Sequence, residues 1–551
     1  MSASISFYLR LLKSDIASFI LITFLQTLFN ISGIFYAVFF RFLLDFAVIS
    51  STSSVSKYCF YFFGVLLMQG LINCFLRLIR EKASINVENQ LKTELMQHVL
   101  YDEYSFVSDI HSGEWMNKFT NDIYVIAANV VNLLPNALSN IFQILIFVSF
   151  ISFYIHDFVW FLSVFVLLAL LFEFYTYKRV KTLHKDVQAK DGKFRIFIQE
   201  CLNSLIVIKT YTREKTIISD AKRYLDEYEQ SRLKKNKFSS IANFIFGIGV
   251  NTALVITGLF CSIAVIEHRI SYGTFLAVVQ LMIQLRSPLA GIYSGIPNYY
   301  SMIGSIERIL SAENGHKGKE TTDCCARSFD RIVLNEVCFS YIHDDKKYVI
   351  ENVDLVINKG EFVGVFGPSG CGKSTLLKLL LSLYSPLKGT IALFKDNSET
   401  LISPESRSLF AYVPQDNQLM KGTIRDVICF GETYDEKKMN DALTISCCKE
   451  FIKDLDKGVL YELKEKGNGL SEGQMQRIAI ARALYSDRPV LLLDEATNAL
   501  NEDLELVVLN NLRQMTDKTV VLITHRKRTL ELVDKAILCE ETEGNYRWKT
   551  R

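Results

Sequence analysis

The sequence lacks an excess of charge of one sign, cysteines in a metal-binding pattern and a recognisable cleaved leader. Its 551 residues contain 61 Lys and Arg against 59 Asp and Glu, for a net charge of +2. This balance gives no argument for a nucleic-acid partner or a strongly acidic one. The 12 cysteines are scattered and never form a CxxC…CxxC pattern, so a zinc site is not expected. The N-terminus has no short charged-then-apolar stretch with a small-residue cleavage site, so we expect no cleaved signal peptide.

Apolar residues, which make up 50% of the chain, are clustered in its first half. Runs of about 20 such residues are long enough to cross a hydrocarbon core of about 30 Å. They also lack the charge that a soluble helix with one buried stripe shows every third or fourth residue. The sequence therefore predicts an α-helical membrane bundle over residues 1–310 with six spans. The predicted spans are residues 17–42, 58–79, 131–155, 158–177, 242–265 and 273–295.

Short and long connections alternate between the predicted spans. Short links join the first and second, third and fourth, and fifth and sixth spans, whereas some fifty to sixty helix-forming, charged residues separate the other neighbours. The second long segment, 178–237, contains about sixteen Lys and Arg. Positive charge near the membrane ends marks the cytoplasmic side. We therefore expect both long segments and both termini to be cytoplasmic.

Polar side chains recur on one face of three predicted spans. Polar groups that face lipid are costly, so these faces should point into the bundle or a wet cavity. For each residue alone, helix–helix hydrogen bonding or an Arg snorkelling to the interface is a sufficient explanation. Taken together, the faces favour a substrate path. They consist of Gln69, Asn73 and Arg77; Asn132, Asn136, Asn140 and Gln143; and Gln280, Gln284 and Arg286.

A phosphate-binding loop lies in the second half of the chain. The polar stretch 311–330 is predicted to be a linker, and strand-like segments follow it in a domain predicted over 331–551. One of them, EFVGVFG, leads directly into GPSGCGKST and then into a helical pattern. Strand, loop and helix in this order are the context of a P-loop, whose backbone amides converge on phosphates at the helix N-terminus. Lys373 would reach the outer phosphates, and the Ser374 hydroxyl would bind Mg²⁺. The sequence therefore predicts an α/β P-loop ATPase domain.

Four further residues, each after an apolar strand-like segment, complete a predicted hydrolytic site. The segment PVLLLDEAT contains two carboxylates: Asp494 suits Mg²⁺ binding through water, and Glu495 suits polarising the attacking water. Gln415 follows FAYVP and can reach the metal, and His525 follows VVLIT and can hold the γ-phosphate side. A lone His at a strand end is usually structural, but chance is a poor explanation for the whole set. A chain with such a site works in a reducing compartment, so we expect free thiols.

The stretch LSEGQ at residues 470–474, followed by MQRIAIARAL, resembles the signature motif of ABC-type ATPases. With six spans ahead of it, the chain resembles a half-transporter of the ABC exporter family over nearly its full length. The resemblance implies a dimer in which ATP lies between the phosphate loop of one subunit and the signature of the other. It also implies coupling helices around Ser105–Glu114 and Ser204–Arg213, and a short loop at Tyr461–Gly467 that senses the membrane domain.

The resemblance further assigns roles to single residues. Tyr341 would stack on the adenine, Gln415 would be the Q-loop residue and His525 the switch histidine. The implied catalytic residues are Glu495, His525 and Gln415, and the implied metal ligands are Ser374, Gln415 and Asp494. The implied nucleotide-binding residues are Tyr341, Gly367, Ser369, Gly370, Cys371, Gly372, Lys373, Ser374 and Thr375, with Ser471, Gly473 and Gln474 from the signature.

The chain departs from the family pattern at two places. Glu472 takes the third position of the signature, where Gly is commonest. Pointing outward it would cost little, and pointing inward it would slow hydrolysis. Ser471 and Gln474 form a capping-box pattern at a helix start. The second departure is NALN, Asn498–Asn501, in place of the usual SALD, which leaves communication across the dimer an open question. Because the phosphate-loop lysine and both carboxylates are present, we still expect catalysis.

The expected function is ATP-driven export of an amphiphilic drug, peptide or lipid by a multi-pass protein of the bacterial inner membrane. ATP binding would close two cytoplasmic ATPase domains and switch the bundle from inward- to outward-facing, and hydrolysis would reset it. The expected partners are the bilayer and a second copy, with a heterodimer of unequal ATP sites left open. Alternatives are an ATP-gated channel or sensor, and import by an exporter fold. No peptidase-like extension precedes the first span, so cleavage of a leader peptide is not expected.

Overall fold

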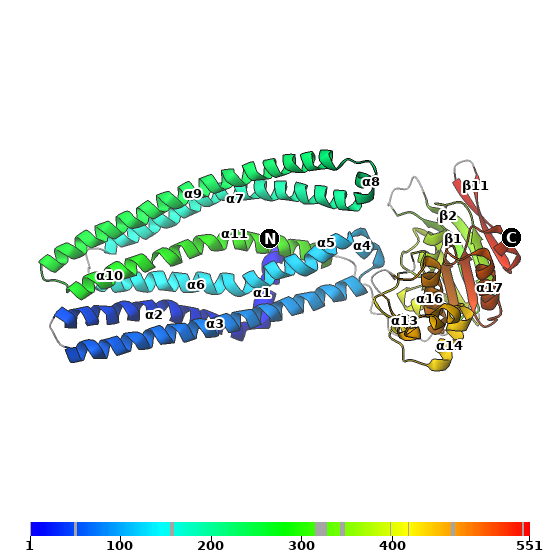
Figure 1. Cartoon of the computed structure of the whole chain (residues 1–551), viewed down its shortest axis with the longest axis horizontal. Helices are drawn as coiled ribbons and strands as arrows, with labels where there is room; N and C mark the ends of the chain where they lie inside the picture. Colours follow the sequence, from blue (N-terminus) through cyan, green and yellow to red (C-terminus); the bar gives the residue numbers. More distant parts are fainter. Residues whose placement is uncertain are drawn as a thin grey trace. The chain divides into compact units, whose positions relative to one another are not determined.

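The computed structural model of the chain divides into two compact units (Figure 1). Unit 1 comprises Met1–Gln97 and His111–Asn314, and unit 2 comprises His98–Ile110 and Gly315–Arg551. The structure describes residues 2–48, 52–154, 159–313, 328–341, 348–396, 398–416, 418–463, 469–542 and 545–551.

Parts of several predicted segments lie outside the described residues. These parts are the link residues 49–51, the turn region 155–158, the linker residues 314–327, and residues 464–468 of the loop before the signature. Cys324 and Cys325 belong to the linker part. The described cysteines are free thiols, as predicted.

Unit 1 consists of helices, because a chain in a bilayer has to satisfy its backbone hydrogen bonds internally. Its long helices are α2 (Ile16–Val48), α3 (Thr52–Tyr101), α6 (Ile123–Tyr154), α7 (Val159–Asn203), α9 (Glu214–Ile266) and α11 (Arg286–Glu313). Its shorter elements are α1 (Ser2–Ser14), α5 (Ser112–Asn117), the π-helical turn η1 (Lys118–Asp122), α8 (Leu205–Thr210) and α10 (Tyr272–Gln284).

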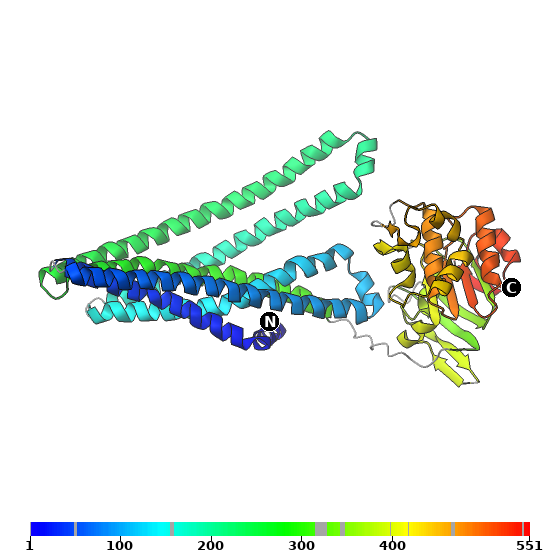
Figure 2. The same cartoon turned by 60° about the horizontal axis from the view of Figure 1, so that its bottom comes forward.

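The long helices of unit 1 pack in a bundle and a hairpin. Helix α2 packs on α6 and α10, and α6 packs on α11. The shared core includes the buried Ala37, Phe147, Val278 and Leu281. Helices α7 and α9 pair with one another, and α8 lies at the end where the chain turns between them (Figures 1 and 2).

Four stretches of the described chain are long and apolar enough to span a membrane: Ile16–Ala47, Val55–Tyr101, Ser112–Phe153 and Glu214–Ile266. They overlap the first, second, third and fifth predicted spans. The fourth predicted span lies in α7 from Val159 onward. The sixth is divided at Leu285 between α10 and α11. This break follows from Pro288, which has no amide hydrogen to donate to the carbonyl of Gln284.

The predicted polar faces of unit 1 mostly meet neighbouring helices. Gln69 donates to Ser32 Oγ at 2.8 Å, which joins α3 to α2. The amides of Gln284 and Asn140 lie against Gly33 and Gly291, where an added Cβ would clash with them. Small residues at helix contacts allow such close approach. Two predicted members of these faces, Arg77 and Arg286, are instead exposed in the single chain.

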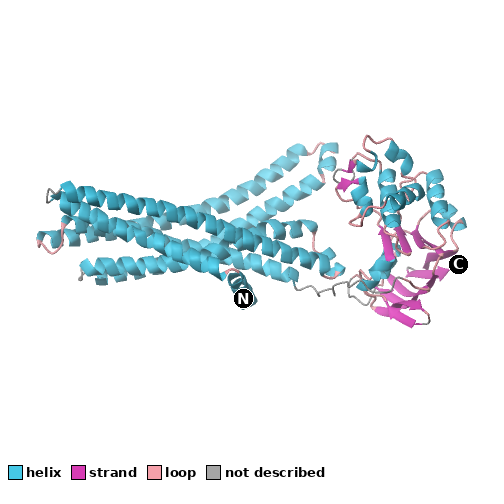
Figure 3. Ribbon diagram, turned by 90° about the horizontal axis from the view of Figure 1, so that it is seen from below, coloured by secondary structure: helices cyan, strands magenta, loops and turns pink. Residues whose placement is uncertain are grey.

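Unit 2 holds every strand among the described residues (Figure 3). Its six-stranded sheet has the order β12-β11-β3-β10-β9-β6, and β11, β3, β10, β9 and β6 run parallel. Near-continuous apolar strands fit a parallel sheet that is covered on both faces. The strands are β3 (Phe362–Phe366), β6 (Phe410–Val413), β9 (Val490–Asp494), β10 (Thr519–Ile523), β11 (Lys535–Thr542) and β12 (Asn545–Thr550).

A four-stranded antiparallel sheet, ordered β2-β1-β4-β5, and the pair β7-β8 complete the strands. These strands are β1 (Arg331–Phe339), β2 (Ile350–Asn358), β4 (Lys388–Lys395), β5 (Ser398–Leu401), β7 (Gly422–Thr423) and β8 (Glu462–Leu463). The α-helices of unit 2 are α4 (Tyr104–Asp109), α12 (Lys373–Leu380), α13 (Ile424–Cys429), α14 (Glu436–Ile445), α15 (Lys449–Lys453), α16 (Glu472–Tyr485) and α17 (Glu502–Arg513). Short 3₁₀ turns are η3 (Pro404–Leu409), η4 (Gly458–Leu460) and η6 (Lys527–Glu531).

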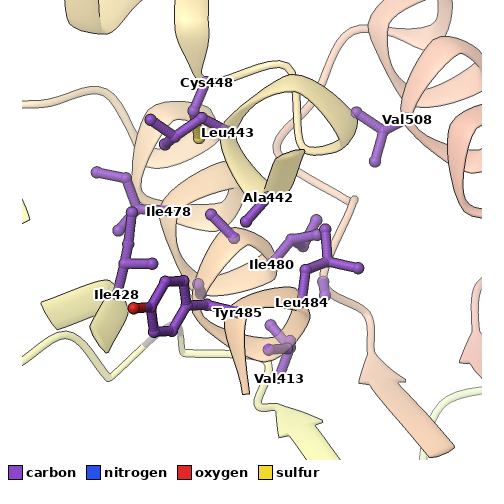
Figure 4. Packing of buried hydrophobic residues seen from close by; sticks show 14 of the residues in the cluster. Val413, Ile428, Ala442, Leu443, Cys448, Ile478, Ile480, Leu484, Tyr485 and Val508 are labelled. Atoms are coloured by element: carbon purple, nitrogen blue, oxygen red, sulfur yellow. The ribbon is translucent and has the colours of Figure 1, made fainter. Parts of the chain in front are cut away.

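Two apolar cores cover the two faces of the six-stranded sheet. Alternate residues of β9 belong to different cores, Leu491 to one and Leu492 to the other, as the pleat of a strand requires. The first core is centred on α16, whose Ile480 and Tyr485 point into it beside Val413 of β6 (Figure 4). The second core joins the sheet to α12 and to the four-stranded sheet. Both cores hold the strands that end at the candidate site.

In unit 1, a buried carboxylate fixes the start of α6 to α11. Asp122, the last residue of η1, is fully buried. Its Oδ1 accepts from Ser305 Oγ at 2.9 Å and from a terminal nitrogen of Arg308 at 2.5 Å. Its Oδ2 accepts from Arg308 Nε at 3.0 Å. This two-point pairing is the strong geometry for an arginine with a carboxylate.

Arg308→Ala should destabilise unit 1 by about 2 kcal/mol or more, because the buried Asp122 loses its ion partner. The effect stays below that of a fully buried pair, since 52% of the Arg308 side chain is exposed. Thermal unfolding of the purified protein in detergent measures it. Arg10→Ala is the control, because the exposed Arg10–Glu94 pair should contribute about 0–1 kcal/mol. Equal unfolding temperatures for both variants would contradict the role given to Asp122.

Candidate functional site

The predicted site residues follow four neighbouring strands of the six-stranded sheet. Strands β3, β10, β9 and β6 are adjacent and parallel, so their carboxyl ends meet at one edge. The phosphate loop follows β3, His525 follows β10, Asp494 ends β9, and Gln415 follows β6. The strand order thus gathers side chains that are far apart in the sequence.

The phosphate loop, residues 367–372, leads directly into α12. Gly370 and Gly372 have φ angles of 84° and 95°, which favour glycine. An added Cβ at Gly372 would lie 2.9 Å from a neighbouring backbone carbonyl oxygen, so this position has no room for a side chain. Lys373 is buried, and its ammonium donates to two carbonyls of its own loop at 3.0 and 2.8 Å. The loop therefore holds a cation beside the N-terminus of α12.

Cys371 places a thiol in the same loop, beside Cys539 of β11. A hydrogen bond with Cys539 and the ammonium of Lys373 lower the pKa of the Cys371 thiol to about 7. The hydrogen bond with Cys371 and burial raise the pKa of Cys539. Cys371 therefore tends toward the thiolate while Cys539 keeps its proton. Ser369, in contrast, is exposed on the outside of the loop.

Two hydroxyl groups hold Asp494 at the end of β9. Its Oδ1 accepts from Ser374 Oγ at 2.8 Å, and its Oδ2 accepts from the Tyr412 hydroxyl at 3.0 Å. Burial raises the pKa of Asp494 above its ordinary value, and both hydrogen bonds oppose that rise. Burial and the charge of Asp494 raise the pKa of Tyr412, so its hydroxyl stays a donor. Hydroxyl and carboxylate oxygens are the ligands that Mg²⁺ prefers, and a dication would favour the ionised Asp494, so these residues fit the ion.

Glu495 forms the centre of a second group. It leaves the strand with a φ angle of 53°, and its amide donates to the carbonyl of Ile523 at 3.2 Å. Its Oε2 accepts from Gln415 Nε2 at 3.2 Å and from Asn498 Nδ2 at 2.7 Å. Its Oε1 lies 2.9 Å from His525 Nε2. The structure thus joins the three predicted catalytic side chains in one hydrogen-bonded group.

The predicted adenine-binding residue is tied to the phosphate-loop helix. The hydroxyl of Tyr341 lies 3.0 Å from Thr375 Oγ1 of α12. Its ring stands edge-on to the rings of Phe339 and Tyr384, with centroids 5.1 and 5.3 Å apart. Half of Tyr341 is exposed. The stacking role stays a prediction.

Helix α4 contacts this aromatic group within unit 2. The ring of Tyr104 stands edge-on to the ring of Tyr384 with centroids 5.9 Å apart, and Ser108 Oγ lies 3.2 Å from the Tyr384 hydroxyl. Helix α4 contains the first part of the predicted coupling segment Ser105–Glu114. Its contact with Tyr384, and through that ring with Tyr341, is the geometry that a coupling role requires.

The signature residues begin α16. Ser471 and Gln474 form the predicted capping box, which is confirmed: Ser471 N donates to Gln474 Oε1 at 2.8 Å, and Gln474 N donates to Ser471 Oγ at 3.3 Å. Gly473 packs against the carbonyl oxygen of Ala499, which would lie 3.0 Å from an added Cβ. Glu472 is exposed. Among the described residues, no hydrogen bond of Ser471, Gly473 or Gln474 reaches the phosphate loop of the same chain.

The second departure from the family pattern has a local structural role. Asn501 caps α17 by accepting from Leu504 N at 3.0 Å, as an Asp would also do. Asn498 is the residue that donates to Glu495. The NALN segment therefore still supports both the helix and the candidate site.

Sequence reasoning missed Tyr412, Asn498 and Tyr384. Tyr412 reaches Asp494 because it pairs with Leu492, two residues before that carboxylate, and this register depends on a partner strand. The contact of Asn498 with Glu495 could have been predicted from the sequence. A residue three positions further along lies close to Glu495 when the chain forms a turn there. Tyr384 had no such signal, because its contacts come from two distant segments, α4 and residues 339–341.

Comparison with known proteins places both halves of the chain. The family described as the ABC transporter transmembrane region matches residues 19–289, and the ABC transporter family matches residues 350–498. An export ATP-binding/permease protein of Rickettsia prowazekii is 28% identical over 98% of this chain and 95% of its own length. An ATP-dependent lipid A-core flippase of Aliivibrio fischeri is 27% identical over 84% of this chain and 80% of its own.

The fold is that of a solved exporter. The structure of a bacterial Atm1-family ABC exporter with ATP bound has a TM-score of 0.80 with 19% sequence identity, over 98% of this chain and 95% of that chain. The predicted fold class, a helical membrane bundle followed by an α/β P-loop ATPase domain, is confirmed. The matched nucleotide-binding family also confirms ATP as the ligand of this domain. The chain therefore belongs to the ABC transporters, as an exporter-type half-transporter whose ATPase domain drives transport across a membrane.

Proposed function

We propose that two copies of this chain form an exporter of an amphiphilic molecule in the inner membrane of a bacterium. The chain is a membrane protein and an ATPase coupled to export. We propose five further points: the dimer, the class of cargo, the location in the inner membrane, the binding of Mg²⁺ and the roles of the single residues. The observation that carries the residue roles and the Mg²⁺ site is the meeting of Lys373, Ser374, Asp494 and Glu495 at one sheet edge, in a chain with a transmembrane region.

Lys373 and the loop around it would bind the phosphates. The ammonium now donates to two backbone carbonyls, which are neutral acceptors. Charged phosphate oxygens make stronger hydrogen bonds, so Lys373 would transfer its donors to them. Ser374, Asp494 and Gln415 would hold Mg²⁺, which when bound neutralises charge on the phosphates. Tyr341 would stack on the adenine, and its hydroxyl contact with Thr375 would hold the ring in place.

Glu495 would act as the general base, and His525 would control its release. Both oxygens of Glu495 are engaged, Oε2 by Gln415 and Asn498 and Oε1 by His525. Losing one of these contacts would make Glu495 a stronger base toward a water molecule, because each donor stabilises the ionised carboxylate. The His525 contact is the one to exchange, because His525 lies alone at Oε1, whereas Gln415 and Asn498 share Oε2. An imidazole that turns to the γ-phosphate would therefore free Oε1 when ATP is present.

The signature would serve the second copy. Ser471, Gly473 and Gln474 lie at the N-terminus of α16, where backbone amides favour an anion. Their hydrogen bonds in the described chain do not reach their own phosphate loop, so a partner's ATP is the ligand that explains their placement. Each ATP site would then form only when two ATPase domains close. ATP thereby favours the closed state through its differential affinity.

Glu495→Gln should lower ATP turnover by about 10²–10⁴-fold, because an amide cannot accept the proton of the attacking water. ATP affinity should remain close to that of the parent. Phosphate release in nanodiscs and binding of a fluorescent ATP analogue measure the two quantities. Glu502→Gln is the matched control, since Glu502 is an exposed carboxylate paired with Arg528. Equal turnover in Glu495→Gln and parent would refute the role of Glu495.

Tyr412→Phe should make Mg²⁺ activation more sensitive to acid. Tyr412 donates to the ionised Asp494, so its removal raises the pKa of that carboxyl further. Protons then compete better with Mg²⁺ as the pH falls. Half-activation of ATPase should need more Mg²⁺ than in the parent at acidic pH, and the excess should disappear as the pH is raised to about 8.

The control for this experiment is Tyr434→Phe, which removes an exposed hydroxyl far from Asp494 in the sequence. It should leave the Mg²⁺ requirement unchanged at both pH values. A Tyr412→Phe requirement that does not vary with pH would contradict the link between Tyr412 and the titration of Asp494.

A further inference from the structure

A network of polar side chains connects α2, α3 and α6 in unit 1. One terminal nitrogen of Arg80 donates to Asn136 Oδ1 at 2.7 Å and to Gln26 Oε1 at 3.0 Å. Gln26 Nε2 in turn donates to Asn30 Oδ1 at 3.1 Å. These four residues, from three different helices, form what we call the Arg80 cluster.

The Arg80 cluster has enclosed donors without acceptors. Arg80 Nε and Asn30 Nδ2 are both buried and have no hydrogen-bond partner among the described residues. The amide oxygens of Gln26, Asn30 and Asn136 already accept hydrogen bonds within the cluster. Buried donors without partners are costly, so the chemistry that the cluster lacks is a hydrogen-bond acceptor.

The Arg80 cluster also carries an uncompensated charge. A guanidinium stays protonated in a protein, and among the described residues no carboxylate lies within ion-pair distance of Arg80. Two other arginines of unit 1 differ in this respect, because Arg41 pairs with Asp45 and Arg308 pairs with Asp122. An ionisable group inside a membrane domain without a protein counter-ion points to a ligand.

Arg80 directly follows the second predicted span, at the end that is predicted to be cytoplasmic, and its partners lie within other predicted spans. Gln26 and Asn30 lie near the middle of the first predicted span, and Asn136 lies near the start of the third. A head group at this level would leave an attached apolar tail among the spans. The ligand that fits is therefore an amphiphile, with its polar end at Arg80.

We infer that the Arg80 cluster binds the oxyanion head group, a phosphate or a carboxylate, of the amphiphile that this chain exports. A water molecule would satisfy the free donors but would leave the charge, whereas an oxyanion satisfies both and matches the planar guanidinium. Cationic amphiphiles would be repelled. The inference rests on the proposed function, since it names the chemical class of the proposed cargo.

Equilibrium binding to the full-length protein in phosphatidylcholine nanodiscs tests this inference. The probes are dodecyl phosphate, dodecyltrimethylammonium with the same chain, and inorganic phosphate without a chain. The parent should bind dodecyl phosphate at least about tenfold more tightly than the cationic probe, with an affinity that falls as salt rises. Inorganic phosphate should bind far more weakly, and tight binding of it would contradict an amphiphile as the ligand.

Variants at Arg80 and at a neighbouring lysine complete the test. Arg80→Gln should remove the preference for dodecyl phosphate, whereas Arg80→Lys should keep part of it because the charge remains. Lys82→Gln is the matched control: Lys82 is exposed on the same helix, and its loss should change dodecyl phosphate affinity by less than about twofold. A parent without preference, or an Arg80→Gln protein that retains it, would overturn the inference.

Two further outcomes are distinguishable. If Arg80→Gln fails to fold, the charge preference of the parent and the behaviour of Arg80→Lys still decide the question. The binding measurement needs no ATP. A parent that hydrolyses ATP but shows no anion preference therefore contradicts only this inference, and a parent without ATP turnover contradicts the proposed function.

Discussion

Two successive carboxylates at the end of β9 have opposite physical requirements, and the surrounding segments are arranged to meet both. Asp494 is buried, so it needs the hydroxyl donors of Ser374 and Tyr412 to remain ionised. In its proposed role Glu495 has to meet a water molecule, and the chain turns into the left-handed region at this residue and presents the side chain to Gln415, Asn498 and His525. Without the four parallel strands β3, β10, β9 and β6, neither set of partners would meet.

In the proposed function, the same contacts would link the nucleotide to movement. His525 and Gln415 both contact Glu495, and each follows a different strand, so a shift of either strand end would change the contacts of the proposed general base. On the other side of the loop, Tyr384 contacts both Tyr341 and Tyr104 of α4. The ring of Tyr384 therefore contacts both the candidate adenine-binding residue and the candidate coupling helix. If Tyr341 stacks on the adenine, a movement of the adenine would be transmitted to α4 through these packed rings.

Where each residue has its own local signal, the sequence predicts which side chains meet at the sheet edge. The phosphate loop, Asp494, Glu495 and His525 each follow an apolar strand-like run, and parallel strands of an α/β sheet place such residues at one edge. The contacts of Tyr412 and Tyr384 were not predictable, because they depend on strand register and on packing between separate segments. The break between α10 and α11 had a local cause in Pro288, which lies inside a stretch long enough to be predicted as one span.

The membrane half illustrates a second limit. Periodicity identified Asn136 and Gln69 as polar positions on helix faces, but it could not show which neighbours they meet. Arg80 follows directly after an apolar run, where snorkelling to the interface is the ordinary expectation. Its contacts with Gln26 and Asn136 turn the guanidinium inward instead. That orientation is a property of three packed helices and has no signature in any one of them.

The central claim is that ATP turnover at Glu495 moves an amphiphile across the membrane against its gradient. Inverted membrane vesicles containing the protein test it directly, with a fluorescent amphiphile outside and ATP added. The account predicts accumulation inside the vesicles above the external concentration, dependent on hydrolysable ATP. Equilibration that stops at equal concentrations, with ATP only opening the path, would contradict the account and indicate a gated channel.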